Sequence, residues 1–164
     1  MSQPTNPKTP EESIRLPAGY RLEAASWRDL PALQRLERLC FPKDAWPWIE
    51  LLQVLTWPGV VRYKISQGNS MVGFVAGQEI DQAGWIVTVA VHPAHRRRGL
   101  GQALVTACEA GLPQQVLRLA VRASNYAALA LYERNGYRVI DRWRRYYVDR
   151  EDALIMEKIR IMGE

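Results

Sequence analysis

Apolar side chains recur every three or four positions over residues 27–39, a spacing typical of one face of an amphipathic helix. The residues that share this spacing are Leu30, Leu33 and Leu36. Ser26 with Asp29 three positions later is typical of a capping box at the start of a helix, and Pro42 cannot continue the helix. The pattern therefore predicts a helix over residues 27–39, and an extended run before it predicts a strand over residues 20–25.

A second apolar segment, residues 48–56, predicts a shorter helix that ends at a Pro-Gly turn. Three extended runs follow, over residues 60–66, 71–80 and 85–92, and turn-forming Gly, Asn and Asp residues separate them. Consecutive strands joined by such short turns pair with one another in antiparallel fashion. We therefore expect an antiparallel meander in the middle of the chain.

The rest of the chain alternates between helical and extended patterns. Helices are expected over residues 99–110 and 125–134, and strands over residues 116–121, 137–144 and 153–159. The order of elements is then β α α β β β α β α β β. This order predicts an α+β fold with a mostly antiparallel central sheet of about seven strands, flanking helices and one strand-helix-strand crossover.

The chain has 164 residues, of which 48% are apolar and 24% are charged, as in ordinary soluble proteins. Residues 1–13 carry three prolines among polar neighbours and are expected to form a flexible leader. Residues 14–164 are expected to form a single domain. No apolar run approaches the length of a membrane helix, and the first residues do not resemble a secretory signal. We therefore expect a cytoplasmic protein with no membrane partner, as a monomer or a weak dimer.

Cysteine usage and charge narrow the chemistry. The two cysteines, Cys40 and Cys108, lie among apolar residues, so we expect neither a disulfide framework nor a metal site. A net charge of +5 and a pI of about 9.5 suit nucleic acid, an anionic surface or a phosphate-rich small molecule. The basic excess lies in the middle of the chain and carries no nucleic-acid recognition motif, so we expect no nucleic-acid partner.

The segment 87–101 joins an extended run, a proline turn, three consecutive arginines and two glycines to the start of a helix. Gly99 and Gly101 let the backbone approach a ligand closely, and a helix N-terminus offers unpaired N–H groups to an anion. The spacing fits neither the dinucleotide fingerprint nor the P-loop. It predicts a cradle for a pyrophosphate, the alternative being a glycine-containing turn with solvated arginines.

These residues carry a resemblance to a known family. Arg96, Gly99 and Gly101 match the acetyl-CoA loop Arg/Gln-x-x-Gly-x-Gly/Ala of the GCN5-related N-acetyltransferase (GNAT) superfamily. Further segments resemble the RimI group, the ribosomal-protein N-terminal alanine acetyltransferases, in order from about residue 20 to residue 159. The matching segments are residues 121–125, 130–133, 135–137, 145–147 and 151–156.

The resemblance implies the GNAT fold, acetyl-CoA as cosubstrate, no metal, and direct acetyl transfer to the α-amine of a protein or peptide N-terminus, such as that of a ribosomal protein. It implies that one stretch of strand, loop and helix start binds the cofactor. The implied residues are Val89, Ala90, Val91, Arg96, Arg97, Arg98, Gly99, Leu100, Gly101 and Gln102. Asn125 is implied as a further cofactor contact, the alternative being a helix cap alone.

The resemblance also implies catalytic and substrate-binding roles. Tyr132 matches the tyrosine that protonates the departing thiolate, although a tyrosine among apolar helix residues is also a common core residue. Tyr146 and Tyr147 match a pair that binds the acceptor peptide, the alternative being ordinary strand-end tyrosines. Trp46 and Trp48 could form the opposite wall of that acceptor channel or an apolar plug under a loop.

The general base is the point where this chain departs from its relatives, because Ala120 stands where RimI proteins carry a glutamate. Strand alternation places the side chain of residue 120 away from the apolar face of its strand. Glu79 is expected near the tip of the hairpin closed by residues 81–84, several residues from Val89, so we do not expect it to be the base. Glu37 and Asp44 flank the loop that lines the acceptor channel in relatives, and a solvated helix face is the favoured interpretation for each.

The acceptor chemistry reduces the demand on a base. A chain terminus with a pKa of about 7.7 to 8 is neutral in roughly a fifth of molecules near pH 7.3, against roughly a thousandth for a lysine side chain. We therefore expect acetylation of α-amines, with ordered water or a residue of the acceptor channel taking the proton. The alternatives are a small-molecule amine acetyltransferase and a non-catalytic acetyl-CoA-binding module.

Charge near the proposed acceptor turn gives one further expectation. Residues 138–150 contain five arginines and two aspartates. Such an excess would favour acceptor peptides with acidic residues and disfavour highly basic ones.

Overall fold

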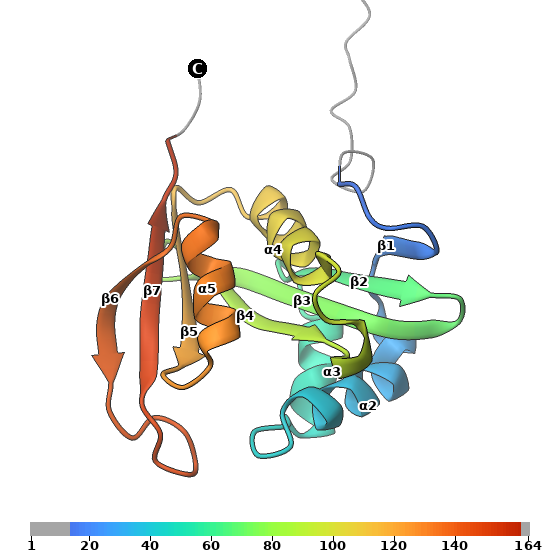
Figure 1. Ribbon diagram of the computed structural model, residues 1–164, viewed down its shortest axis with the longest axis horizontal. Helices are drawn as coiled ribbons and strands as arrows, with labels where there is room; N and C mark the ends of the chain where they lie inside the picture. The colour runs from blue at the N-terminus through green and yellow to red at the C-terminus, as the bar shows by residue number, and fades with distance from the viewer. Residues whose placement is uncertain (1–13, 162–164) are drawn as a thin grey trace, which may run out of the picture.

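The computed structural model describes residues 14–161 (Figure 1). The expected leader, residues 1–13, and the last three residues of the expected domain, 162–164, lie outside the described residues. Seven strands form one sheet: β1 (Tyr20–Ala24), β2 (Val61–Gln67), β3 (Ser70–Ile80), β4 (Ala83–Val91), β5 (Val116–Arg122), β6 (Arg138–Trp143) and β7 (Ala153–Ile159). The helices are α2 (Leu30–Cys40), α3 (Trp48–Thr56), α4 (Leu100–Gly111) and α5 (Tyr126–Arg134), with 3₁₀ turns η1 (Trp27–Asp29) and η2 (Pro93–His95).

The order of elements and the α+β class are confirmed. The strands lie in the order β1-β2-β3-β4-β5-β7-β6, and every neighbouring pair is antiparallel except β4 and β5. That parallel pair is joined through α4, as expected for the single crossover. The last strand, β7, lies between β5 and β6 rather than at the edge of the sheet.

The first predicted helix is divided into two parts. Residues 27–29 form the 3₁₀ turn η1, in which the Leu30 N–H bonds the Trp27 carbonyl, and the α-helix begins only at Leu30. The cause is Pro31, which has no N–H to donate to that carbonyl in an α-helical turn. The predicted cap is present, since the Ser26 N–H donates to Asp29 Oδ2 at 2.8 Å.

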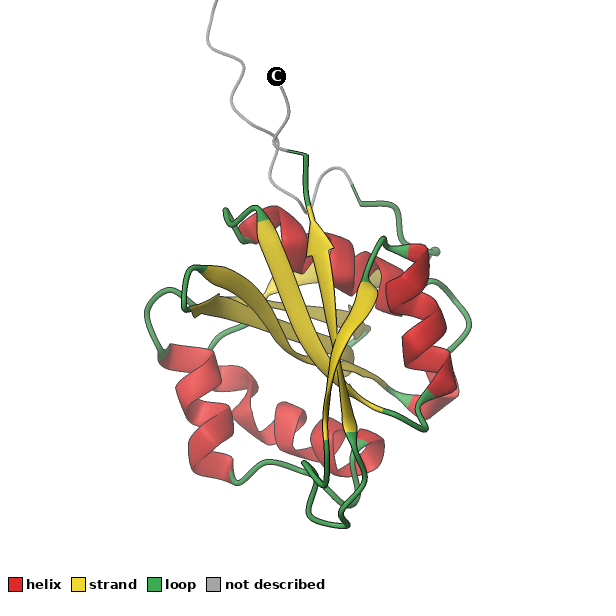
Figure 2. Cartoon of the chain, turned by 90° about the vertical axis from the view of Figure 1, so that its left-hand side faces the viewer, coloured by secondary structure: helices red, strands yellow, loops and turns green. Residues whose placement is uncertain are grey.

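Helices cover both faces of the sheet (Figure 2). On one face, α4 and α5 pack on a buried cluster that includes Leu104, Leu117 and Leu119. On the other face, α2 and α3 pack on a smaller cluster that includes Leu33 and Phe74. Among residues 14–161 no helix is long and apolar enough to cross a membrane.

A bulge bends β4 near its middle. Thr88 pairs with Ala76 and Ile86 pairs with Gly77, so Val87 is an extra residue without a partner in this register. A bulge of this kind increases the local twist of a strand and turns it away from its neighbour. The bend lies where β4 stops pairing with β5.

Candidate active site

Strands β4 and β5 pair only over a short stretch and then diverge (Figure 1). The paired residues are 84–86 of β4 and 117–119 of β5, whereas β4 remains paired with β3 as far as Val91. Beyond Ile86, one edge of β4 therefore faces no neighbouring strand of the described sheet. Backbone groups on such an edge can pair with an extended ligand.

A cavity of about 170 Å³ lies where the two strands diverge. Its walls come from β4, β5, α5, the end of α2 with the loop after it, and the loop between β6 and β7. It brings together four residues that were candidates from sequence: Val89, Asn125, Tyr132 and Tyr147. It also contains three positions at issue for the general base, Glu37, Asp44 and Ala120.

The loop before α4 has the backbone expected of an anion cradle. Gly99 is the N-cap of α4 and has a φ of 80°, and an added Cβ there would meet no atom within 4 Å. The first helical hydrogen bond runs from the Ala103 N–H to the Gly99 carbonyl at 3.1 Å. The amides of Leu100, Gly101 and Gln102 therefore precede the helical ladder, where a helix N-terminus binds anions.

The glycine at position 101 is required for packing rather than for its backbone conformation. A Cβ at this position would lie 3.2 Å from Leu131 Cδ2, so the glycine lets the first turn of α4 approach α5 closely. The side chain of Gln102 strengthens the same contact, because it exchanges two hydrogen bonds with the Asn135 side chain at 2.6 and 2.8 Å. The start of α4 is thus fixed against the end of α5.

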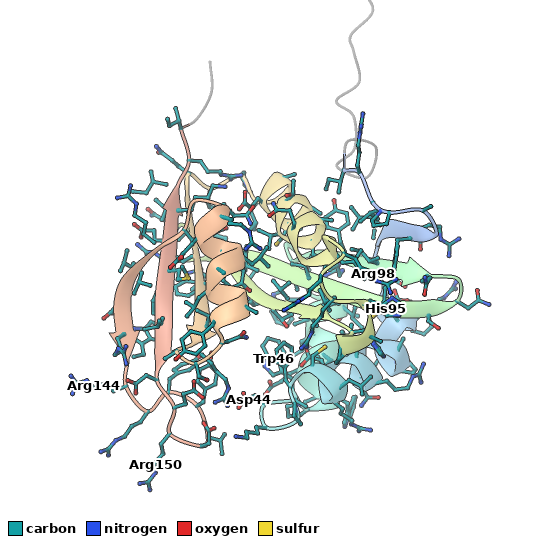
Figure 3. The ribbon with its side chains drawn as sticks, in the orientation of Figure 1. Asp44, Trp46, His95, Arg98, Arg144 and Arg150 are labelled. Carbon is teal, nitrogen blue, oxygen red and sulfur yellow. The ribbon has the colours of Figure 1, made fainter. Side chains whose placement is uncertain are left out.

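Two of the three loop arginines are held by the protein itself. Arg96 Nε donates to the Val91 carbonyl at 3.1 Å. Arg98 Nη1 donates to the Tyr20 hydroxyl at 2.7 Å, and that oxygen lies 2.8 Å from His95 Nδ1. Arg98 and His95 accordingly lie together beside the first strands of the sheet (Figure 3). These bonds fix the shape of the loop, and the cradle is formed by its backbone.

Asn125 is a helix cap that also faces the cavity. Its Oδ1 accepts a hydrogen bond from the Ala128 N–H at 3.2 Å at the start of α5. The capping alternative considered for this residue is therefore observed. Its position on the cavity wall leaves the cofactor-contact prediction in place.

Tyr132 lies on α5 and is only 8% exposed. Its ring packs edge-to-face on Tyr137 with 6.0 Å between centroids, so it belongs to the apolar core as well as to the cavity wall. Burial raises the pKa of its hydroxyl above the usual value of 10. The hydroxyl therefore keeps its proton at neutral pH and is able to donate it.

Glu37 is the main correction to the sequence-based interpretation, which placed it on a solvated helix face. It is buried, with 1% of its surface exposed, and it lines the cavity. Thr88 Oγ1 donates to its Oε1 at 3.3 Å, and a backbone hydrogen bond from Trp46 adds a second contact. Burial outweighs these two bonds and raises the pKa of the carboxyl to about 7.

A sequence signal for this burial exists. Leu33, Glu37 and Cys40 follow the same four- and three-residue spacing, so Glu37 lies on the apolar stripe of α2. A carboxylate on such a stripe is either paired or functional, because burying an ionised group without compensation is costly. Of the residues that the structure describes, no lysine or arginine forms an ion pair with Glu37.

The expected strand alternation in β5 is confirmed. Leu117, Leu119 and Val121 are buried on the α4 and α5 face. Ala120 lies on the opposite face with its side chain at the cavity, where it contributes no acid or base. The small methyl group leaves the space next to β5 open.

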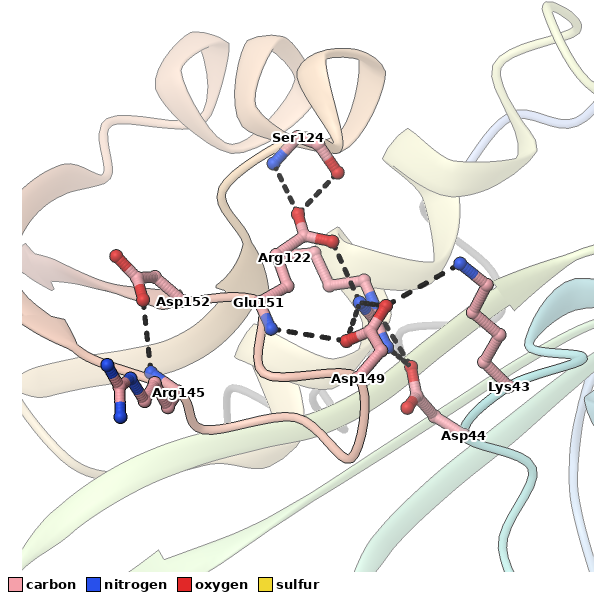
Figure 4. Close-up of polar contacts among 8 residues, drawn as sticks. All are labelled: Lys43, Asp44, Arg122, Ser124, Arg145, Asp149, Glu151 and Asp152. Atoms are coloured by element: carbon pink, nitrogen blue, oxygen red, sulfur yellow. Dashed lines mark hydrogen bonds and ion pairs between the residues drawn. The ribbon is translucent and has the colours of Figure 1, made fainter.

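Arg122 links the two loops at the mouth of the cavity (Figure 4). Its guanidinium bonds Asp44 of the loop after α2 at 2.8 Å through Nε. Its Nη1 bonds Asp149 at 3.0 Å and Glu151 at 2.8 Å, both in the loop between β6 and β7. Asp44 is therefore held in an ion pair and is not the solvated side chain that was expected.

The two tyrosines of the β6–β7 loop occupy different places. Tyr147 lines the cavity, and the Arg122 guanidinium carbon lies 4.2 Å from the centre of its ring. Tyr146 is 53% exposed and packs on Trp143 with 5.4 Å between ring centroids. The structure thus brings Tyr147 into the site and places Tyr146 at its outer rim.

Trp46 forms a wall of the cavity, which favours the first of its two interpretations. It also lines a neighbouring cavity of about 420 Å³ between α3 and the sheet, together with Val87 and Glu50. Trp48 is 56% exposed and lines neither cavity. The two cavities share Trp46 and Val87 as a common wall.

The charge expectation for the acceptor side stays a prediction. The basic stretch was counted to residue 150, and the next two residues, Glu151 and Asp152, are acids that bond Arg122 and Arg142 respectively at 2.8 Å. Arg144 and Arg150 project away from the molecule (Figure 3). These acids offset part of the basic excess counted over residues 138–150.

Within residues 14–161, no group of three His, Cys, Asp or Glu side chains is arranged to hold a metal ion. Cys108 is buried, and burial raises the pKa of its thiol to about 12. Cys40 donates through its Sγ to the Val91 carbonyl at 3.3 Å. Both cysteines are free in the structure.

The known proteins that this chain resembles are acetyltransferases. The model of the Acetyltransferase (GNAT) family matches residues 30–137. The N-terminal acetyltransferase A complex catalytic subunit NAA10 of Arabidopsis thaliana is 33% identical over 146 residues, which cover 84% of this chain and 76% of the relative. The ribosomal protein bS18-alanine N-acetyltransferase of Escherichia coli K12 is 34% identical over 135 residues, which cover 78% of this chain and 89% of the relative.

A solved structure shows the same architecture. The crystal structure of the ribosomal-protein-S18-alanine N-acetyltransferase from Escherichia coli aligns with a TM-score of 0.77 at 31% identity. The alignment covers 88% of this chain and 97% of that one.

Proposed function

The chain belongs to the GNAT family of acetyltransferases, and we propose that it transfers the acetyl group of acetyl-CoA directly to the N-terminal α-amine of a protein or peptide. The observation that carries the proposal is the cavity at the divergence of β4 and β5, where the open edge of β4 meets Tyr132 and Tyr147. Residues 14–164 act as one catalytic domain.

The described residues fit acetyl-CoA. The free edge of β4 around Val89, Ala90 and Val91 suits the extended, amide-bearing pantetheine arm, and the first amides of α4 suit the pyrophosphate. The arginines of the loop, residues 96–98, add attraction for the phosphates at longer range. The cosubstrate supplies a thioester whose acyl carbon an amine can attack.

The protein contributes polarisation and proton transfer. A backbone N–H of β4 near Val89 or Ala90 stabilises negative charge on the thioester oxygen as the amine attacks. The Tyr132 hydroxyl gives its proton to the thiolate that leaves. Tyr146 and Tyr147 bind the backbone of the acceptor peptide, and Tyr147 is the one of the two that lines the cavity.

The acceptor is best identified by chemistry and by the relatives together. An α-amine, with a pKa of about 8, is far more often neutral at pH 7 than a lysine side chain. The similarity to an enzyme of ribosomal protein bS18 makes a ribosomal protein terminus the first acceptor to test. We place the reaction in the cytoplasm, and the enzyme acts as a monomer or a weak dimer.

A competition experiment tests this function. Purified protein and acetyl-CoA are incubated with peptides that present free N-termini, including one from a ribosomal protein, with the same peptides blocked at the terminus but containing lysine, and with small amines. Mass spectrometry should find acetylation of free termini only. Acetylation of lysines or small amines with no modified terminus would contradict the proposal.

A further inference from the structure

The acceptor terminus is mostly protonated at pH 7, so acetyl transfer needs a group in the cavity that removes a proton from nitrogen. The resemblance to the RimI group implies a glutamate at a position where this chain has Ala120. Its neighbours on the same face of β5, Arg118 and Arg122, are cations that pair with carboxylates. Strand β5 therefore offers no proton acceptor to the cavity.

Three carboxylates at the cavity mouth are already engaged. Asp44, Asp149 and Glu151 all bond the guanidinium of Arg122. These bonds lower the pKa of Asp149 and of Glu151, for which two hydrogen bonds from Ser124 are the larger cause. A carboxylate stabilised in its ionised form is a weak base.

Glu37 differs from these three in its burial and in its hydrogen-bond partners. It is 1% exposed, it lies on the cavity wall, and among residues 14–161 no cation forms an ion pair with it. Only neutral donors hold it, namely the Thr88 hydroxyl at 3.3 Å and the Trp46 backbone. Thr88 fixes the carboxylate beside β4, the strand whose open edge suits the thioester.

We infer that Glu37 is the general base of the acetyl transfer and takes over from α2 the role that relatives assign to a glutamate on β5. This inference rests on the proposed acetyltransferase function. Both positions line one cavity, Glu37 from α2 and residue 120 from β5. The methyl group of Ala120 leaves room there for the acceptor terminus.

The proton balance of the step is complete. The acceptor reacts as its neutral amine, after the ammonium proton has passed to solvent. The Glu37 carboxylate accepts one further proton from the acceptor nitrogen, directly or across one water molecule, while the C–N bond forms at the acyl carbon. The C–S bond breaks, and the Tyr132 hydroxyl donates its proton to the sulfur. Exchange with solvent returns the proton from Glu37 to Tyr132, and the products are the N-acetyl peptide and CoA.

The other ionisable groups around Glu37 hold one charge state through neutral pH. From α2, Cys40 has a pKa raised by burial above 9.0. From α5 and the β6–β7 loop, burial raises the pKa of Tyr132 above 10 and that of Tyr147 to about 12. Arg122 stays charged and paired with Asp44. Glu37, with a pKa of about 7, is thus the group of the described cavity that changes charge near neutrality.

A pair of isosteric variants tests the assignment. Glu37→Gln should lower kcat at pH 7 by about 100-fold or more, with acetyl-CoA affinity unchanged. Glu79→Gln is the matched control, because Glu79 bonds Gln114 at 3.1 Å at the far end of the sheet and should leave kcat within twofold. A folded Glu37→Gln enzyme whose kcat stays within threefold of wild type would overturn the inference.

A second variant keeps the carboxylate and so does not depend on the folding of Glu37→Gln. Thr88→Val removes the hydroxyl that stabilises the ionised carboxylate. The acid limb of the kcat/KM profile should move to higher pH, with the activity at high pH largely retained. If the acid limb of Thr88→Val stays at the wild-type pH, the limb reports the titration of another group. That result would contradict the role of Glu37.

The two proposals fail in different ways. Absence of acetyl transfer to every terminus by the wild-type enzyme, with acetyl-CoA bound, would count against the proposed function and the base together. Normal transfer by the wild type that survives in both Glu37→Gln and Thr88→Val would count against the base alone.

Discussion

The face of the sheet covered by α4 and α5 offers the cleft backbone amides and one hydroxyl, whereas the face covered by α2 and α3 offers it a buried carboxylate. Part of the first face is set by local geometry, such as the left-handed Gly99 at the start of α4. The second depends on contacts between distant segments, such as Glu37 with Thr88. In the proposed mechanism, cofactor binding and acid chemistry belong to one face, and base chemistry and acceptor binding belong to the other.

The largest expected effect is a loss of kcat on removing the hydroxyl that the first face offers. Tyr132→Phe keeps the ring that packs on Tyr137 and removes only the hydroxyl. We expect kcat to fall by about 100- to 1,000-fold, while the affinity for acetyl-CoA, measured by calorimetry, changes less than threefold. Turnover equal to wild type would show that the thiolate leaves without this proton donor.

The next effect concerns the second face and is one of stability. The pKa of Glu37 is raised from 4.5 to about 7 in the folded state, so the folded protein loses stability as the pH rises through this interval. Glu37→Gln removes that loss and should raise the free energy of unfolding at pH 8.5 by up to about 3 kcal/mol. Urea unfolding at pH 4 and 8.5 measures this.

At pH 4 the two proteins should be equally stable, because the carboxyl is protonated in both the folded and the unfolded state. A variant that loses activity and gains stability is expected of a functional group that burial destabilises. Equal stability at pH 8.5 would mean that Glu37 is not strained by burial.

Arg122 connects the loop after α2 to the loop that carries Tyr147. Arg122→Ala leaves three carboxylates without their shared cation and should cost about 2 kcal/mol of stability. The peptide KM should rise about tenfold with the acetyl-CoA KM unchanged. Arg122→Lys keeps the charge but loses the forked guanidinium, so its peptide KM should lie between those of the wild type and Arg122→Ala. Equal peptide KM values in all three proteins would contradict a positioning role for Arg122.

The smallest expected effect is a partial recovery of kcat when the carboxylate is moved from α2 to β5. Ala120→Glu introduced into Glu37→Gln places a carboxylate on β5 in the same cavity. We expect kcat to recover about tenfold over Glu37→Gln alone, in the steady-state assay at pH 7.5. No recovery in a folded double variant would indicate that Glu37→Gln fails for a reason other than the missing base.

The sequence predicted the first face better than the second for a physical reason. The residues of the proposed cofactor cradle, from Val89 to Gln102, are contiguous, and Gly99 and the helix start have conformations that local chemistry dictates. The order of strands and helices follows from periodicity in the same way. The insertion of β7 between β5 and β6 does not, because pairing order depends on long-range contacts.

The second face required the folded chain. The burial of Glu37 arises where α2 packs on β4, 51 positions further along the chain. The spacing of Leu33, Glu37 and Cys40 was a usable signal, but it specifies burial without specifying what the carboxylate meets. The ion pairs of Arg122 with Asp44 and Glu151 likewise join segments that no local pattern connects.

The most direct test of the account is the pH dependence of kcat/KM in the wild-type enzyme with two acceptor peptides whose α-amines differ in pKa. Two inflections are predicted on the acid side: one near pH 7 that is common to both peptides, from Glu37, and one at higher pH that follows the amine of each peptide. A single inflection that moves entirely with the peptide amine would contradict a general base on α2.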